Sequence, residues 1–218
     1  MPPLPTYTSD NLPLWHALAE SEAGVILLAR FAGVALPLTA GQILWVNMVN
    51  MVNMVTLALA FEPAEPGVMQ RPPRRPAEPL ATRVMAFRIA YVSLLMIAVT
   101  FAVLGRKLAR GSSLEVARTA AVNMLVVGEL VYLFNVRHFT TSAFTRDLVT
   151  GNPVAFWMNM LLIGFQLLYT YAPPLQQVFQ TAALDGASWL VILSMGPLKF
   201  LAIEGEKAVL RRLDIRNM

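Results

Sequence analysis

Three kinds of residue are scarce in this 218-residue chain, and each scarcity excludes a class of protein. There is no cysteine, so the chain holds neither a disulfide nor a thiolate metal site. Only 14% of the residues are charged and 56% are hydrophobic, which is too little charge to cover the surface of a soluble domain. The two histidines, His16 and His138, have no second ligand at metal-binding spacing. Lys and Arg form no run interleaved with aromatic residues, so the sequence predicts no nucleic-acid partner.

The apolar residues come in blocks of about 20, the length at which a helix of about 1.5 Å rise per residue crosses a bilayer. We therefore predict an all-α membrane protein whose transmembrane segments form a six-helix bundle in the lipid bilayer. Asp185 is the predicted N-cap of the last helix, which Pro197 is expected to kink. The six predicted spans are residues 21–36, 42–61, 84–104, 116–135, 154–171 and 186–203.

The second span carries a polar ridge. Asn47, Asn50, Asn53 and Thr56 recur every three residues, and residues three apart are neighbours on a helix. Amides in hydrocarbon need partners, so this ridge must face other helices or a wet cavity. The triplet Val-Asn-Met occurs three times in succession here, which is consistent with a tandem duplication in the coding sequence or with an asparagine ladder.

Ionisable residues inside spans are costly, and they mark candidate functional sites. Glu22 and Glu129 are acids placed within predicted spans. Arg30 lies in the middle of the first span, where a charge costs about 2.5–3.5 kcal/mol, and it either neutralises Glu22 or marks a span released from selection. Arg88 lies near a span end and is expected to snorkel to the interface. Trp45, Trp157 and Trp189 lie near span ends and are expected to anchor the membrane interface.

Basic residues set the predicted orientation. With six spans both termini lie on one side, and the connections on that side carry ten basic residues against three on the other. The positive-inside rule then places both termini in the cytoplasm, as expected of an integral protein of the cell (plasma) membrane. The ten are Arg71, Arg74, Arg75, Arg83, Arg137, Arg146, Lys207, Arg211, Arg212 and Arg216, and the three are Arg106, Lys107 and Arg110.

Three motifs carry a resemblance to a known family. They are QILWVNMV at 42–49, FEPAEPGVMQRPPR at 61–74 and ARTAAVNMLVVGELVYLFNVR at 117–137. In this order and spacing they resemble the carboxy-terminal membrane half of a P-type cation-transporting ATPase, in the branch of the calcium pumps and their bacterial relatives. The resemblance covers about residues 20–212 and implies that the six spans are the last six of ten family helices.

The resemblance also implies a set of cation ligands. Glu22 falls where the fifth family helix carries its ligand glutamate. Asn47 and Asn50 fall on the asparagine and threonine of the sixth-helix motif. Glu129 falls on the eighth-helix glutamate, with Asn135 at the position of its companion asparagine. Carboxylate and amide oxygens are the ligands that hard cations prefer, so Glu22, Asn47, Asn50 and Glu129 form the predicted metal site. Asn53 and Thr56 are interpreted as helix–helix contacts.

The chain departs from the family pattern in two ways. Met51 stands where calcium pumps have an aspartate, which removes a charged ligand and leaves the transported cation unspecified. The Asp-Lys-Thr-Gly-Thr phosphorylation segment does not occur, nor does a glycine-rich phosphate cradle. The resemblance therefore assigns ATP and Mg²⁺ to domains outside this sequence. Phosphoryl transfer depends on such positioned groups, so we expect no ATP hydrolysis from this chain alone. Its cation affinity should be weaker than about 10⁻⁴ M.

These observations predict three regions and one function. Residues 1–18 are an expected irregular, proline-rich leader without the basic start of a secretory signal, 19–204 the transmembrane domain, and 205–218 a basic cytoplasmic tail. The predicted function is the ion-pathway portion of a P-type cation ATPase, as a fragment or split-pump subunit whose partner is the N-terminal half. The alternative is a non-enzymatic membrane subunit that binds or regulates another transporter.

Overall fold

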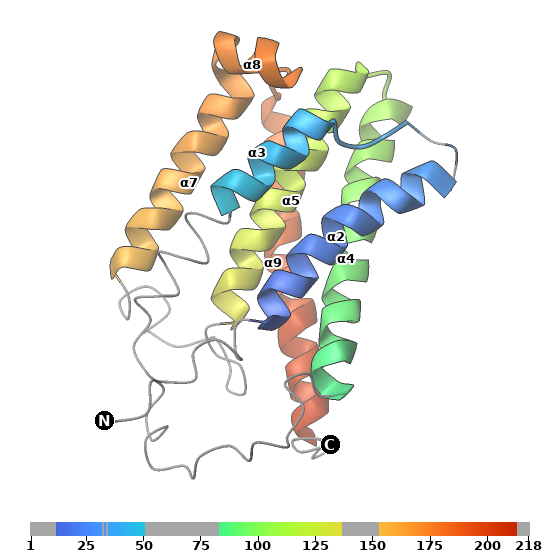
Figure 1. Cartoon of the computed structure of the whole chain (residues 1–218), viewed down its shortest axis with the longest axis vertical. Coiled ribbons are helices and arrows are strands. Elements are labelled where there is room, and N and C mark those ends of the chain that lie inside the picture. The colour runs from blue at the N-terminus through green and yellow to red at the C-terminus, as the bar shows by residue number, and fades with distance from the viewer. Residues whose placement is uncertain (1–11, 32, 34, 51–82, 137–152, 213–218) are drawn as a thin grey trace.

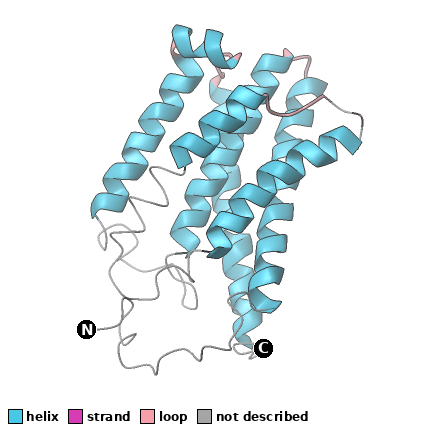
Figure 2. Cartoon of the chain, in the orientation of Figure 1, coloured by secondary structure: helices cyan, strands magenta, loops and turns pink. Residues whose placement is uncertain are grey.

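The computed structural model describes residues 12–31, 33, 35–50, 83–136 and 153–212, and every regular element in these ranges is a helix (Figure 2). The all-α prediction is confirmed for these residues. In Figure 1, α4, α5, α7 and α9 run along the length of the molecule, while α2 and α3 cross them obliquely. The helices are α2 (Leu12–Phe31), α3 (Ala40–Asn50), α4 (Arg83–Ala109), α5 (Leu114–Val136), α7 (Pro153–Tyr171), α8 (Pro173–Phe179) and α9 (Gly186–Arg212).

Helix α5 is the centre of the bundle and contacts α2, α3, α4, α7 and α9. Its residues from Thr119 through Val126 are all buried, so other helices surround this part of α5 on every side. On the side of α4, the small residues Ala117 and Ala121 pack against Leu104 and Phe101. Small residues let two helices approach closely. Such contacts are common between transmembrane helices, because the surrounding lipid is as apolar as the side chains and the hydrophobic effect does not drive the helices together.

Helix α2 lies across α4, and the two pack tightly at one glycine. A Cβ atom added at Gly24 would collide with Ile97 Cδ1 of α4, so only glycine fits this contact without a shift of the isoleucine. The helix ends at Phe31, and Gly33 follows with a φ of 64°, a left-handed conformation that suits glycine.

A capping box begins α3. Gln42 N donates to Thr39 Oγ1 (3.3 Å), and Thr39 N donates in return to Gln42 Oε1 (3.0 Å). Gln42 Nε2 also donates to the carbonyl oxygen of Phe179 at the end of α8 (3.1 Å). The start of α3 is thereby joined to the segment after α7.

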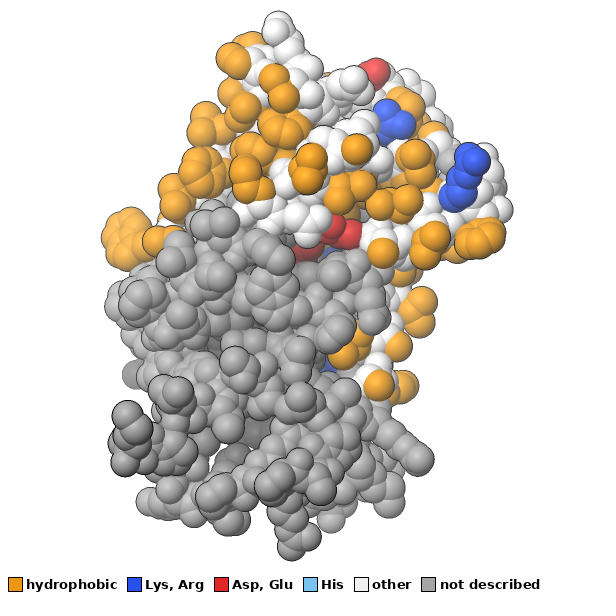
Figure 3. Space-filling model, viewed as in Figure 1, with side chains coloured by type: hydrophobic (Ala, Val, Ile, Leu, Met, Phe, Trp, Pro, Cys, Tyr) orange, Lys and Arg blue, Asp and Glu red, His pale blue; other side chains and the backbone are white. Residues whose placement is uncertain are grey.

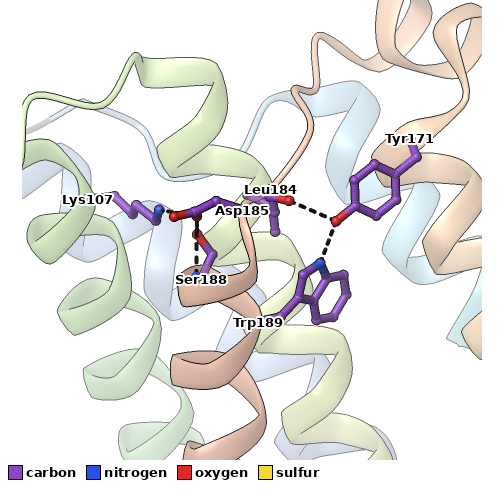
Figure 4. Close-up of polar contacts among 6 residues, drawn as sticks. All are labelled: Lys107, Tyr171, Leu184, Asp185, Ser188 and Trp189. Atoms are coloured by element: carbon purple, nitrogen blue, oxygen red, sulfur yellow. Dashed lines mark hydrogen bonds and ion pairs between the residues drawn. The ribbon is translucent and has the colours of Figure 1, made fainter.

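Polar contacts fix the start of α9, as Figure 4 shows. The Asp185 carboxylate accepts hydrogen bonds from the backbone N–H and the hydroxyl of Ser188, which confirms the predicted N-cap. Lys107 of α4 donates to the same carboxylate at 2.9 Å. Beside it, Trp189 Nε1 donates to the Tyr171 hydroxyl, which donates to the Leu184 carbonyl, so the ends of α4, α7 and α9 are tied together (Figure 4).

Apolar side chains cover much of the outer surface of α2, α3 and α7, with few charged groups among them (Figure 3). Two of the described helices, at Ala86–Ala109 and Gly186–Glu206, are long and apolar enough to cross a membrane. The complete set of six spans is therefore not established by the described residues and stays a prediction.

Several predicted boundaries differ from the helices. The last part of the expected leader, residues 12–18, belongs to α2, and α9 continues to Arg212 through part of the expected tail. Residues 51–61 of the second predicted span lie outside the described residues, whereas 154–171 matches α7 closely. Pro197 lies inside α9 as expected.

Candidate functional site

Glu22 and Asn47 meet between α2 and α3. Asn47 Nδ2 donates to Glu22 Oε2 at 2.7 Å and also to the Ile43 carbonyl at 3.1 Å. The Glu22 side chain is buried while Asn47 is exposed, so the carboxylate lies inside the bundle and the amide covers it. Two of the four predicted ligands are thus in direct contact.

Glu129 lies on the buried face of α5 and is fully inaccessible to solvent. Neither of its carboxylate oxygens has a hydrogen-bond partner among the described residues. The negative charge of Glu22 repels that of Glu129 inside the bundle. A buried carboxylate without a hydrogen bond is costly unless a positive charge compensates it.

Lys199 of α9 supplies a positive charge that was not predicted from the sequence. Its side chain is 3% exposed, and its ammonium interacts electrostatically with Glu129. The signal was present, because a lysine in the middle of an apolar helix is as unusual as a glutamate there. The charges of Glu22, Glu129 and Lys199, from α2, α5 and α9, therefore influence one another inside the bundle.

A network of neutral polar groups holds α3, α5 and α7 in register beside these charges. Trp45 Nε1 donates to Gln166 Oε1 (3.3 Å), and Gln166 Nε2 donates to Asn123 Oδ1 (3.2 Å). Asn123 Nδ2 in turn donates to Thr170 Oγ1 and to the Thr119 carbonyl. Asn123 lies less than two turns before Glu129 on α5, and Trp45 shortly precedes Asn47 on α3, so the network positions two of the candidate ligands.

The expectations that Trp45 anchors the membrane interface and that Arg88 snorkels are wrong. Trp45 is not an interface anchor, because it is buried and stacks on Tyr169 with a centroid distance of 5.1 Å. Arg88 does not snorkel, because its side chain is buried and pairs with Glu206 of α9 at 3.3 Å. In both cases a partner on a distant helix satisfies the polar group inside the bundle.

Arg30 does not pair with Glu22. It lies in the last turn of α2 with its side chain exposed, where a cation is favoured by the helix dipole. Glu22, which lies two turns earlier, has its hydrogen bond from Asn47 instead.

The remaining ligand candidates are only partly described. Asn50 is the last residue of α3, but its side chain lies outside the described residues, as do Met51, Asn53, Thr56 and the side chain of Asn135. Within the described part of the chain, no group of three or more His, Cys, Asp or Glu residues is placed to hold a metal ion. Any ion held there would rely on Glu22, Glu129 and neutral oxygens.

The chain matches the family described as "Cation transporting ATPase, C-terminus" over residues 35–209. It belongs to this family. The match includes Asn47, Asn50 and Glu129 and begins after Glu22. Together with the relatives below, it identifies the chain as a C-terminal membrane portion of a P-type ATPase, which confirms the resemblance seen in the three motifs.

Curated relatives agree with this family. The chain is 39% identical over 190 residues to a "Probable cation-transporting ATPase F" of Mycobacterium bovis, covering 85% of this chain. It is 31% identical over 199 residues to a "Calcium-transporting ATPase" of Bacillus subtilis, covering 86% of this chain, and 29% identical over 181 residues to "Calcium-transporting ATPase type 2C member 2" of Mus musculus, covering 83%. These matches cover 21%, 21% and 19% of the respective relatives, so the chain spans about a fifth of their length.

Proposed function

We propose that this cation-ATPase C-terminal domain forms the cation pathway of a P-type pump and works together with the ATP-driven part of such a pump. The observations that support this proposal are the Glu22–Asn47 hydrogen bond between α2 and α3 and the buried carboxylate of Glu129 on α5, which the charge of Glu22 repels. Buried carboxylates beside an amide offer the oxygen ligands that a hard cation uses when it sheds water. The relatives' printed names, which include cation and calcium transport, agree with a cation as the cargo.

Under this proposal the partner is the N-terminal half of a P-type ATPase, which would supply ATP and Mg²⁺ chemistry. The six-helix bundle in the plasma membrane with both termini in the cytoplasm is part of the same proposal. Basic residues support the orientation, since ten of them fall on the proposed cytoplasmic side. The absence of cysteine makes a direct test of orientation simple. A single cysteine at Arg75 should react only from the cytoplasm, and one at Arg110 only from outside.

A chimeric pump tests the transport function. The chain would replace the matching segment of the Bacillus subtilis calcium-transporting ATPase, to which it is 31% identical. We expect ATP-dependent cation uptake into inverted membrane vesicles. A chimera that inserts and folds but takes up none of the tested cations would contradict the proposal. That result would favour a role as a regulatory subunit.

A further inference from the structure

The ammonium of Lys199 has an unusual environment. The side chain is 3% exposed, and the Nζ atom has no hydrogen-bond partner among the described residues. An ammonium ion carries three donors and is strongly hydrated in water, so burial without hydrogen bonds is highly unfavourable unless a negative charge lies close by. Within the described bundle the Glu129 carboxylate is the acid whose charge acts on it.

Glycine at position 128 makes room for this ammonium against α5. A Cβ atom added at Gly128 would collide with Lys199 Nζ and would lie 3.4 Å from its Cε. The lysine side chain therefore lies directly over the backbone of α5, one residue before Glu129. Glycine inside a helix is unfavourable by about 1 kcal/mol relative to alanine, so a glycine at the contact point is explained by the space that it leaves for the ammonium.

Lys199 and Glu129 place two buried charges on the same stretch of α5: the ammonium lies against the backbone at Gly128, and it makes no hydrogen bond to the Glu129 carboxylate. The Glu129 oxygens have no hydrogen-bond donors among the described residues, which leaves their lone pairs free, and the positive charge of Lys199 attracts them without a hydrogen bond. From this arrangement we propose that the Lys199 ammonium is the counter-charge of Glu129 when no cation is bound, so that Lys199 and a transported cation compete for this carboxylate. The proposal rests on the function proposed above and concerns the charge requirement of the same site.

The competition has a consequence for the class of cargo. Glu22 and Glu129 carry a formal charge of −2, and Lys199 reduces the total to −1. Ligand charge is a main determinant of affinity for divalent cations, so Lys199 in place disfavours a doubly charged ion at Glu129. Removing the ammonium should make the same helices bind a divalent ion more tightly, although no ligand is added.

The test uses the full chain in lipid nanodiscs with Ca²⁺ as the probe, and it measures the unfolding temperature as Ca²⁺ is raised to about 10 mM. A ligand that binds only the folded state stabilises it by RT ln(1 + [L]/Kd). We expect Lys199→Met to gain at least about tenfold in Ca²⁺ affinity over the original chain, seen as a rise in unfolding temperature of about 2–4 °C. Adding Glu129→Gln to Lys199→Met should remove the gain.

Two controls separate this effect from general changes. Arg106→Met removes a positive charge from an exposed side chain in the last turn of α4, and Leu198→Met places a methionine on the exposed face of α9 next to Lys199. Neither should create a response to Ca²⁺. Gly128→Ala keeps the charge but pushes the ammonium away from its position, so it should give a smaller gain of the same sign.

The unfolding temperatures of the Glu129 and Lys199 variants test the proposal independently of any transport measurement. Without added cation, the Glu129→Gln and Lys199→Met variants should each lower the unfolding temperature, and the double variant should recover much of the loss because no lone charge is left buried. Additive losses, or a Lys199→Met chain that folds and does not respond to Ca²⁺, would overturn the proposal. Failure of both the single lysine variant and the double variant to fold would also contradict it. A chimera that transports while these tests fail would leave the proposed function standing.

Discussion

Asn47 of α3 donates a 2.7 Å hydrogen bond to the Glu22 carboxylate of α2, and the two residues are 25 positions apart in the chain. The same amide group also donates to the Ile43 carbonyl, so both N–H bonds of the side chain are used. The Asn47 oxygen has no part in these two bonds. An asparagine held in this way fixes the Glu22 carboxylate with respect to α3.

Replacing Asn47 by alanine should destabilise the fold, because the buried Glu22 carboxylate loses its hydrogen bond. The loss of a partner from a buried polar group costs about 1–3 kcal/mol. The free energy of unfolding of the full chain, measured by denaturant titration in detergent, checks this value. Met48→Ala is the matched control, since Met48 is the next residue on α3 and is 55% exposed. Equal stability of the two variants would show that the Asn47 bond has no net effect.

Replacing Asn123 by alanine should be at least as damaging. This side chain joins Gln166 and Thr170 of α7 to α5, and its removal leaves Gln166 Nε2 without its acceptor. We expect a loss of about 2 kcal/mol or more, because several buried groups lose partners at once. The Trp45 indole reports the change, since it donates to Gln166, and its fluorescence should shift as the network opens. An unchanged spectrum together with unchanged stability would contradict the role given to this network.

Acid should weaken the start of α9 through Asp185. The hydrogen bonds from Ser188 and then from Lys107 lower the pKa of this carboxyl from 3.8 to about 2. Because the pKa is lowered, the ionised Asp185 carboxylate stabilises the fold fully well above pH 3.8. This stabilisation is lost as the pH falls through about 2. The size is small because the side chain is exposed to water.

The matched variant for this prediction is Asp185→Asn, which keeps an oxygen acceptor for the cap and removes the charge. Between about pH 4 and about pH 2, the range set by the lowered pKa, the unfolding temperature of the original chain should fall more steeply than that of the variant. Parallel curves would mean that the carboxylate charge contributes nothing in this range.

Much of the helical framework could be predicted from local sequence. The apolar run at 154–171 ends before Pro173 and matches α7, and Asp185 before a glycine and a serine marks the cap of α9. Two further local signals mark the starts of α3 and α8. Thr39 and Gln42 have capping-box spacing, and Pro173 and Pro174 begin the short helix α8, since proline suits the first helical positions.

The contacts of the site could be predicted only in part, because most partners are distant in the chain. Glu22 and Glu129 stand out as acids inside predicted spans, and the family resemblance adds Asn47. The Trp45–Gln166 bond joins residues 121 positions apart, so a tryptophan near a span end was wrongly expected at the interface. Lys199 is unusual as a lysine in an apolar helix, but its position against Gly128, one residue before Glu129, depends on how α5 and α9 pack, which periodicity does not specify.

The most direct test of the central claim is the cation concentration that half-saturates phosphoenzyme formation in the chimeric pump. Glu129→Gln keeps the size of the side chain and removes its charge, and the account predicts at least about a tenfold higher half-saturating concentration, equivalent to about 1.4 kcal/mol of binding. Glu115→Gln makes the same exchange at an exposed position on the same helix and should leave the value unchanged. Equal half-saturating concentrations for the chimera and its Glu129→Gln variant would contradict the claim that this helix bundle carries the cation.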